Sequence, residues 1–197
     1  MNLEIKGFED KFINTLKTKE WQKLQEDFIN SQRIMIVGNG GNLAVADHAA
    51  IDVARLTNKS AFAPGSGILA SSLIHETSHD EWVKNWVAIS MRGIKEELFS
   101  ETLIIGISSS GISKNIKKAL DFAKDQNIKT ALITGKSPSE KIRSNTVVLD
   151  VNEYHTGEVL TLMFFYQLIH GAGFNCPNIE DEGATTNRII DYNLGFN

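Results

Sequence analysis

The sequence is poor in cysteine and proline and has no excess of positive charge. The single cysteine, Cys176, excludes a disulfide within the 197-residue chain. Three prolines and 15 glycines are too few for a fibrous or linker-like protein. Lys and Arg total 20 against 24 Asp and Glu, a formal net charge of −4, so general binding to nucleic acid or to an anionic membrane is not expected.

Long hydrophobic runs are also missing. The longest apolar-rich stretch, residues 159–169, is too short to span a bilayer. The first residues, MNLEIKGFEDKF, carry acidic side chains where a secretory signal would place its apolar segment. With 42% hydrophobic and 22% charged residues, the composition is that of an ordinary soluble globular domain, and we expect a cytoplasmic protein.

Apolar residues recur at helical spacing over residues 8–29, which predicts an N-terminal helix interrupted near Lys19. Short apolar runs then alternate with helical segments. The predicted strands are 33–37, 68–74 (the weakest), 102–107, 128–134 and 146–150. The predicted helices are 42–56, 80–98, 113–125 and 157–171, the second with Trp82, Trp86, Ile89 and Leu98 facing inward.

This alternation predicts an α/β fold: a doubly wound (Rossmann-like or flavodoxin-like) five-stranded parallel sheet with an extra N-terminal helix. We divide the chain into an N-terminal helix (1–30) for oligomerisation, a central domain (31–174) and a C-terminal extension (175–197). The extension has little apolar content before Ile189, and it is either an ordered arm that wraps a partner subunit or a loose end.

Two loops follow strands and precede helices, where doubly wound folds bind ligands. The first is Gly38-Asn39-Gly40-Gly41-Asn42. Its glycines allow close approach of a ligand, and its Asn side chains can cap the helix or bind a sugar hydroxyl. Leu43 occupies the third glycine position of a dinucleotide-binding loop, so no nucleotide cofactor is expected. The alternative is a tight turn without a ligand.

The second loop, residues 108–113, places four serines in six positions: Ser108, Ser109, Ser110 and Ser113. A helix N-terminus favours an anion, and the hydroxyls can complete the shell around a phosphate monoester. Ile112 stands where a loop that binds a nucleoside triphosphate carries lysine. The expected ligand is therefore a phosphate ester and not a nucleotide. The alternative is a serine N-cap with flexible neighbours.

His48 and Asp52 are four residues apart on the helix that follows the first loop, so they share one face. Such a pair can chelate a metal, or act as a base with its orienting partner. The alternative is an exposed polar stripe, since Asp47 is adjacent.

These motifs together resemble the sugar-isomerase (SIS) domain and, within it, the phosphoheptose isomerases. The resemblance rests on the VGNGGN loop, the GISSSGIS loop and the strand ending ALITGK, in this order within residues 1–172. It implies a long N-terminal helix, a five-stranded parallel sheet and a homotetramer (or homodimer) with active sites between subunits. It also implies isomerisation of sedoheptulose 7-phosphate to D-glycero-D-manno-heptose 7-phosphate in surface-heptose biosynthesis, commonly with bound zinc.

Matched by position, the resemblance assigns substrate binding to both loops: Asn39, Gly40, Gly41, Asn42, Ser108, Ser109, Ser110 and Ser113. His48 matches the metal-binding His, and Asp52 matches a Glu. Glu76 is matched to a substrate-lining Asp; its segment, residues 75–80, could hold a sugar or a metal or could be a solvated loop.

The last helix departs from the family pattern. Met163 stands where the family has a catalytic His, and His155 stands at a family Gln. Because Met163 cannot transfer a proton, we expect a rewired site of His48, Asp52, His155 and Glu158. In it, Asp52 or Glu158 is the base and His155 its acid partner; with zinc, His48, Asp52 and His155 are the ligands. The alternative for His155 is a helix-entry residue that bonds locally.

The sequence therefore predicts a phosphosugar aldose–ketose isomerase that acts through an enediol. The alternatives are a non-catalytic SIS protein, which binds a phosphosugar as a sensor or serves as an assembly factor, and an isomerase of another sugar phosphate. The residue Met163 favours the sensor, whereas the complete serine loop, His48 and Asp52 favour an enzyme.

Overall fold

The computed structural model describes residues 7–177. Five parallel strands form one sheet in the order β2-β1-β3-β4-β5. Their bounds are β1 Arg33–Val37, β2 Ser60–Phe62, β3 Thr102–Ile107, β4 Lys129–Thr134 and β5 Asn145–Val148. The predicted α/β class and the five-stranded parallel sheet are confirmed. The chain order reverses between β1 and β3, and such a reversal is where doubly wound sheets bind their ligands.

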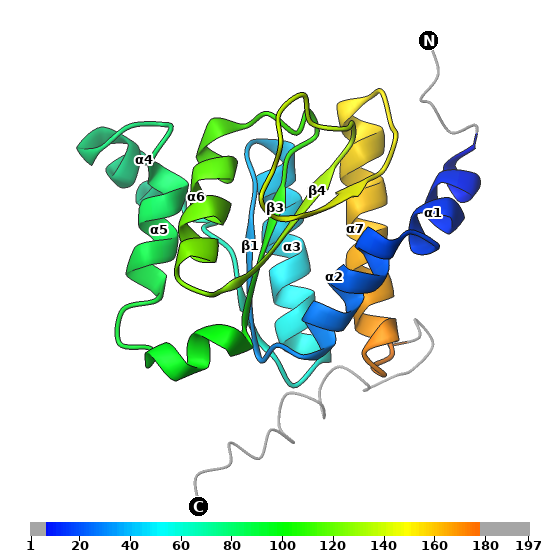
Figure 1. Cartoon of the computed structure of the whole chain (residues 1–197), viewed down its shortest axis with the longest axis horizontal. Helices are drawn as coiled ribbons and strands as arrows, with labels where there is room; N and C mark the ends of the chain where they lie inside the picture. Colours follow the sequence, from blue (N-terminus) through cyan, green and yellow to red (C-terminus); the bar gives the residue numbers. More distant parts are fainter. Residues whose placement is uncertain (1–6, 178–197) are drawn as a thin grey trace, which may run out of the picture.

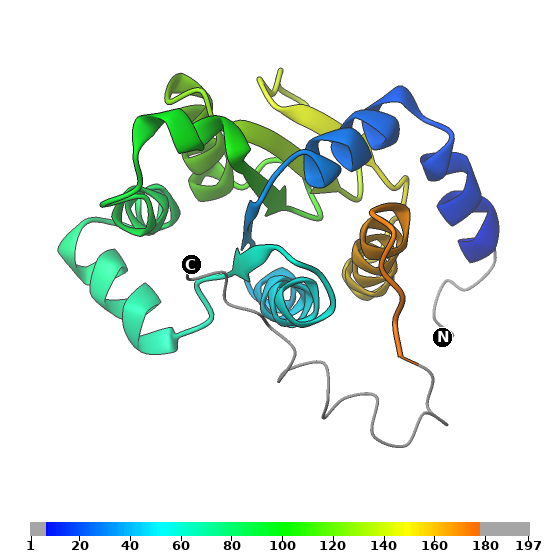
Figure 2. The same cartoon turned by 90° about the horizontal axis from the view of Figure 1, so that it is seen from below.

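Helices cover both faces of the sheet (Figures 1 and 2). Their bounds are α1 Phe8–Leu16, α2 Lys19–Ile29, α3 Gly41–Leu56, α4 Gly67–Glu76, α5 Trp82–Ser90, α6 Lys114–Asp125 and α7 Tyr154–Gly171, with a 3-10 helix at Glu96–Glu101. The N-terminal helix is interrupted as predicted, because the Thr18 hydroxyl accepts a hydrogen bond from the Trp21 N–H and starts α2.

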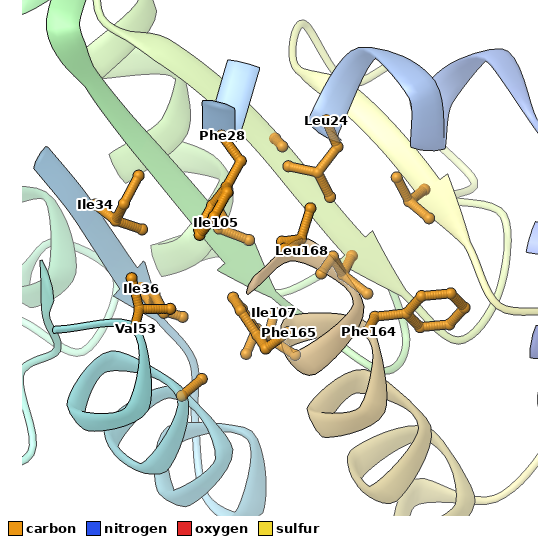
Figure 3. Close-up of a cluster of buried hydrophobic side chains, with 14 of the residues drawn as sticks. Leu24, Phe28, Ile34, Ile36, Val53, Ile105, Ile107, Phe164, Phe165 and Leu168 are labelled. Carbon is orange, nitrogen blue, oxygen red and sulfur yellow. The ribbon is translucent and has the colours of Figure 1, made fainter. Parts of the chain in front are cut away.

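One core lies between the sheet and the helices α2, α3 and α7 (Figure 3). Phe28 from α2, Val53 from α3 and Phe165 from α7 meet Ile105 of the central strand, and all four are fully buried. A second core, on the other face, joins α4, α5 and α6 to the sheet. Because alternate residues of a strand face opposite sides, burial on both faces makes the strands continuously apolar. This explains why β1, β3 and β4 were recognisable.

Two predicted elements are wrong. Residues 68–74, predicted as a strand, lie in the helix α4, which the Ser66 hydroxyl caps by accepting a hydrogen bond from the Leu69 N–H. The fifth strand is instead β2, only three residues long. A short apolar run does not by itself separate strand from helix.

The helix predicted over 80–98 is also too long. α5 ends at Ser90, and Gly93 has a φ of +79°, a conformation that side-chain-bearing residues rarely adopt. Trp82 and Trp86 are buried as predicted, but Ile89 and Leu98 are 39% and 41% exposed, so their predicted inward orientation is wrong.

The predicted domain boundaries stay predictions, but α2 contributes Trp21, Leu24 and Phe28 to the first core. Most of the predicted C-terminal extension lies outside the described residues. No helix within residues 7–177 is long and apolar enough to cross a membrane.

Candidate functional site

The two predicted loops lie side by side at the carboxyl end of the sheet. β1 and β3 are neighbours, with Val37 in register with Gly106, so the loops that follow them emerge together. The Asn42 side-chain amide donates a hydrogen bond to the Ser109 Oγ at 3.0 Å. The glycine-rich loop and the serine-rich loop therefore form one surface at the point where the strand order reverses.

The glycine-rich loop makes a tight turn that its side chains stabilise. A Cβ atom at Gly38 would lie 2.5 Å from the Asn42 carbonyl oxygen, so this position requires glycine. The side-chain amides of Asn39 and Asn115 pair reciprocally, at 2.9 and 2.7 Å. Asn115, at the start of α6, is 1% exposed and was not predicted as a site residue. The Asn39 amide thus holds the loop in place.

The serine-rich loop ends at the N-terminus of α6. The Ser108 hydroxyl donates to the Ser113 hydroxyl at 2.8 Å, and the Gly111 N–H donates to the Ser108 carbonyl at 2.9 Å. Ser113 is the N-cap residue, but its side chain makes no capping hydrogen bond. The Ile116 N–H, the third of α6, donates to the Asn115 Oδ1 at 3.0 Å, so the N–H groups before it are those that can bind an anion.

A pocket of about 200 Å³ opens beside this loop. Its lining includes Ser109, Ser110, Lys136 and residues 151–154. The Lys136 ammonium lies 3.2 Å from the Asp150 carboxylate, and it lowers the pKa of Asp150. Lys136 was missed as a site residue, although it belongs to the ALITGK motif, and it adds a positive charge to the serine hydroxyls.

A second cluster forms where α3 packs against α7. The Asp52 carboxylate, whose side chain is 9% exposed, accepts hydrogen bonds on both oxygens. Arg55 Nη2 lies 2.9 Å from Oδ1, while the Tyr166 hydroxyl and His48 Nε2 lie 3.1 and 3.2 Å from Oδ2. The predicted pairing of His48 with Asp52 is therefore present.

Tyr166 was not predicted as a functional residue. Burial and, to a lesser extent, the charge of Asp52 and the hydrogen bond to it raise the pKa of Tyr166, so its hydroxyl stays protonated at neutral pH. The available signal was its position three residues after Met163, on the same face of the helix. Met163 itself is 36% exposed.

His155 and Glu158 form a third group at the start of α7. His155 Nδ1 lies 3.4 Å from Glu158 Oε2, and the side chains are 81% and 22% exposed. The Glu158 carboxylate lies against Gly41, where an added Cβ would be 2.1 Å from Oε1. The glycine at this position therefore makes room for the carboxylate beside the glycine-rich loop.

The structure does not bring the His48–Asp52 pair and the His155–Glu158 pair together into the single site that we predicted. His155 and Tyr166 are eleven residues apart on one straight helix, about 16 Å along its axis. Within residues 7–177, no three His, Cys, Asp or Glu side chains gather as a metal would require. The predicted zinc ligand set of His48, Asp52 and His155 is therefore not assembled within one chain, and both oxygens of Asp52 already accept hydrogen bonds.

Glu76, predicted to line the substrate, is exposed at the last residue of α4. Its Oε1 accepts a hydrogen bond from the Ser72 hydroxyl at 3.2 Å. α4 packs against α5 on the face of the sheet opposite α3 and α7 (Figure 1). Within one chain, Glu76 is thus on a helix across the sheet from α3, which carries His48 and Asp52, and its role stays a prediction.

Residues 85–171 match the family model described as SIS domain. The chain also resembles the phosphoheptose isomerases. It is 35% identical over 116 residues to the phosphoheptose isomerase of Helicobacter pylori, an alignment that covers 57% of this chain and 58% of that protein. The chain thus matches a little over half the length of this relative.

Two further comparisons cover more of the molecule. The phosphoheptose isomerase of Syntrophotalea carbinolica is 28% identical over 153 residues, which are 76% of this chain and 74% of that protein. The structure of phosphoheptose isomerase from Neisseria gonorrhoeae superposes with a TM-score of 0.68 at 17% identity, covering 84% of this chain and 91% of that one. The SIS fold and the resemblance to phosphoheptose isomerases are therefore confirmed.

Proposed function

We propose that this protein is an enzyme that interconverts an aldose and a ketose sugar phosphate. The observation that carries the proposal is the serine-rich loop, which places Ser109 and Ser110 in one pocket with Lys136 and leads into the N-terminus of α6. This arrangement provides donors and one positive charge for a phosphate group without a nucleotide-binding loop. Relatives named phosphoheptose isomerase support the reaction class.

The favoured substrate is sedoheptulose 7-phosphate, converted to D-glycero-D-manno-heptose 7-phosphate for surface-heptose biosynthesis in the cytoplasm. The phosphate fixes one end of the open-chain sugar, and this binding energy positions the carbonyl end along the surface between α3 and α7. A heptose has six C–C bonds of about 1.5 Å each, which gives a zigzag reach of roughly 8 Å. His48 follows Asn42 by six residues, about 9 Å along α3. The two lengths are comparable.

The reaction needs a base for a carbon-bound proton and acids for the two oxygens. Glu158 and His155 lie nearest the glycine-rich loop and are one such pair; His48 and Asp52 are the other. A homotetramer or homodimer, with sites completed between subunits, is part of this proposal. Zinc also stays a proposal: His48 and Asp52 would supply two ligands, and zinc would polarise the substrate carbonyl.

A substrate panel tests the function. The purified protein is incubated with ketose phosphates of five, six and seven carbons, and aldose formation is measured with and without added zinc. We expect turnover of the seven-carbon substrate and at least a tenfold loss of affinity in Ser110→Ala, because a hydrogen bond to a charged group contributes about 1.5–3 kcal/mol. The matched control is Ser71→Ala, at an exposed position of α4.

The second candidate is a phosphosugar-binding protein without catalysis. It is favoured by Met163, which stands where the family has a catalytic His. It is also favoured by Asp52, because both carboxylate oxygens of this residue already accept hydrogen bonds. Binding of sugar phosphates that Ser110→Ala weakens, with no turnover of any panel member, would establish this second candidate.

A further inference from the structure

The pocket beside the serine-rich loop has two charged side chains among the described residues that line it. Lys136 is the cation and Glu153 is the anion. An ammonium attracts a phosphate group and donates hydrogen bonds to it, whereas a carboxylate repels it. If Lys136 were removed, the charge left on this lining would be that of Glu153. The ability of the pocket to accept an anion therefore depends on Lys136.

The backbone at Lys136 is fixed to the serine-rich loop. The Gly135 N–H donates a hydrogen bond to the Ser109 carbonyl at 3.0 Å. A Cβ atom at Gly135 would lie 2.8 Å from the same carbonyl oxygen, so this close approach requires glycine. The Thr134 hydroxyl donates to the Lys136 carbonyl at 2.9 Å and closes the turn. The lysine side chain therefore starts from a fixed point beside Ser109.

Asp150, which follows β5, holds the far end of this side chain. Its Oδ1 lies 3.2 Å from Lys136 Nζ. The N–H groups of its two neighbours in the sequence donate to the carbonyls of Thr134 and Gly135, at 2.8 and 2.9 Å. The backbone on both sides of Asp150 is thus bound to the segment that leads into Lys136. These hydrogen bonds keep the carboxylate opposite the ammonium.

A second lysine supports the backbone of Asp150. The φ of Asp150 is +52°, in the left-handed region that Asp and Asn adopt more readily than most residues. Lys11 of α1 donates a hydrogen bond to the Asp150 carbonyl, and its ammonium lies 3.9 Å from the carboxylate Oδ2. The N-terminal helix therefore contacts the residue that orients Lys136.

The ion pair with Asp150 leaves Lys136 free to bind a ligand as well. An ammonium has three N–H donors, and Asp150 Oδ1 is the acceptor that the described part of the chain provides for it. The side chains of Lys136 and Asp150 are 47% and 79% exposed, and water weakens such a pair. The remaining N–H groups can therefore donate to a phosphate while Asp150 keeps the side chain at the pocket.

We propose that Lys136 makes this pocket select a phosphorylated sugar over a neutral one, and that Asp150 and Lys11 are positioning residues for its ammonium. This inference rests on the proposed function and adds to it the origin of the phosphate selectivity. Asp150 acts by orienting Lys136 and not by touching the ligand, because its carboxylate would repel a phosphate. Lys11 acts one step further away, through the backbone and carboxylate of Asp150.

Calorimetric titration with sedoheptulose 7-phosphate tests the role of Lys136. Lys136→Met should raise the Kd at least tenfold, because a hydrogen bond to a charged group is lost. It should also narrow the ratio between the Kd values of sedoheptulose and its 7-phosphate, whereas Lys136→Arg, which keeps the charge, should bind nearly as tightly as wild type. The matched control is Lys141→Met, which removes an exposed lysine from the same loop and should leave the Kd unchanged.

Salt provides a readout that a purely structural defect would not change. The Kd of wild type should rise with sodium chloride, because salt screens the attraction between the ammonium and the phosphate. In Lys136→Met this dependence should be weaker, while Lys141→Met should follow wild type. Wild-type affinity and wild-type salt dependence in Lys136→Met would overturn the inference.

The sign of the Asp150→Asn effect tests the positioning role. Asn keeps the left-handed backbone conformation but lacks the charge that attracts Lys136. If Asp150 positions the lysine, the Kd should rise about two- to fivefold, as for loss of an exposed ion pair. The same substitution should have no effect in Lys136→Met, because Asp150 acts through that lysine. A lower Kd in Asp150→Asn would show that the carboxylate competes with the phosphate, and it would overturn the positioning role.

Lys11→Met should raise the Kd in the same direction, and it should add nothing in Asp150→Asn. Its matched control is Lys17→Met, at the C-cap of the same helix. Additive effects of Lys11→Met and Asp150→Asn would contradict the order of contacts that we propose.

Turnover separates this inference from the proposed function. Binding that depends on Lys136, with no turnover of any substrate in the panel, would refute an isomerase and leave the role of the lysine in place. Turnover with equal KM values in wild type and Lys136→Met would overturn the role of the lysine and leave the isomerase standing.

Discussion

Asn42 and Ser109 are 67 positions apart in the sequence, yet the Asn42 amide donates to the Ser109 hydroxyl at 3.0 Å. This hydrogen bond joins the loop after β1 to the loop after β3 at the point where the strand order reverses. Ser109 also accepts the Gly135 N–H through its carbonyl, which links the same loop to β4. The serine hydroxyls are thereby held in place before any ligand binds.

Asn42→Ala should raise the Kd of a sugar phosphate up to tenfold, because a neutral hydrogen bond contributes about 0.5–1.5 kcal/mol. Isothermal titration calorimetry measures the change. Asn85→Ala is the matched control, since Asn85 on α5 donates to Thr77, away from both loops. Equal affinities in wild type and Asn42→Ala would show that the link does not organise the loop.

The two glycines at the ends of the first loop should respond differently to alanine. At Gly38 the added Cβ would meet backbone, 2.5 Å from the Asn42 carbonyl oxygen, so Gly38→Ala should lower Tm by several degrees. At Gly41 it would meet the flexible end of Glu158, so Gly41→Ala should leave Tm nearly unchanged and displace the carboxylate. Thermal unfolding and the isomerase assay distinguish the two. A larger Tm loss in Gly41→Ala would contradict this packing.

Lys59 should stabilise the fold although it is a nearly buried cation. It is 6% exposed, and its ammonium donates to the carbonyls of Ile29 and Ser31 at 3.0 and 2.7 Å. Burial, and secondarily the charge of Lys129, lowers the pKa of Lys59. Lys59→Met leaves both carbonyls without this donor and should cost about 2 kcal/mol in urea unfolding. Lys95→Met, at an exposed position, is the control and should cost less than about 0.5 kcal/mol.

The thiol of Cys176 should react slowly in the folded protein. Burial, and to a lesser extent the charge of Asp52, raises the pKa of Cys176 above its ordinary 9.0. Only the thiolate attacks a disulfide reagent, so the rate with Ellman's reagent should rise with a midpoint above pH 9.0 and should increase when urea unfolds the chain. Because the unfolded thiol loses its proton first, this thiol's contribution to stability is complete below pH 9 and is lost as pH rises through the raised folded pKa. A midpoint at or below 9.0 would refute the environment described.

Much of the fold was predictable because it depends on local patterns. The continuous apolar runs of β1, β3 and β4 are buried on both faces of the sheet. The glycine-rich loop directly follows β1, and the serine-rich loop directly follows β3. The i, i+4 spacing of His48 and Asp52 was also readable. The strand β2 could not be predicted from the sequence. It has only three residues, of which Ser60 is exposed, and so short a segment gives no periodic signal.

The parts of the site that escaped prediction depend on contacts between helices. Tyr166, in an apolar helix, resembles a core aromatic residue in the sequence, and its spacing from Met163 gains a meaning only when α7 is packed beside α3. The same packing places Tyr166 beside His48 and Asp52, so His155, about 16 Å from Tyr166 along the same helix, lies apart from them, whereas the sequence alone suggested one site for all four candidates. The spacing of apolar residues predicts which face of each helix is buried, but it does not predict how far one helix is shifted along its neighbour.

The most direct test of the account is proton NMR of the purified protein with sedoheptulose 7-phosphate in D₂O, with and without zinc. The account predicts that solvent deuterium appears at C2 of an aldoheptose phosphate, because the proton removed from carbon exchanges on the base before it returns. Substrate binding without any deuterium incorporation would contradict an isomerase and leave a phosphosugar-binding protein.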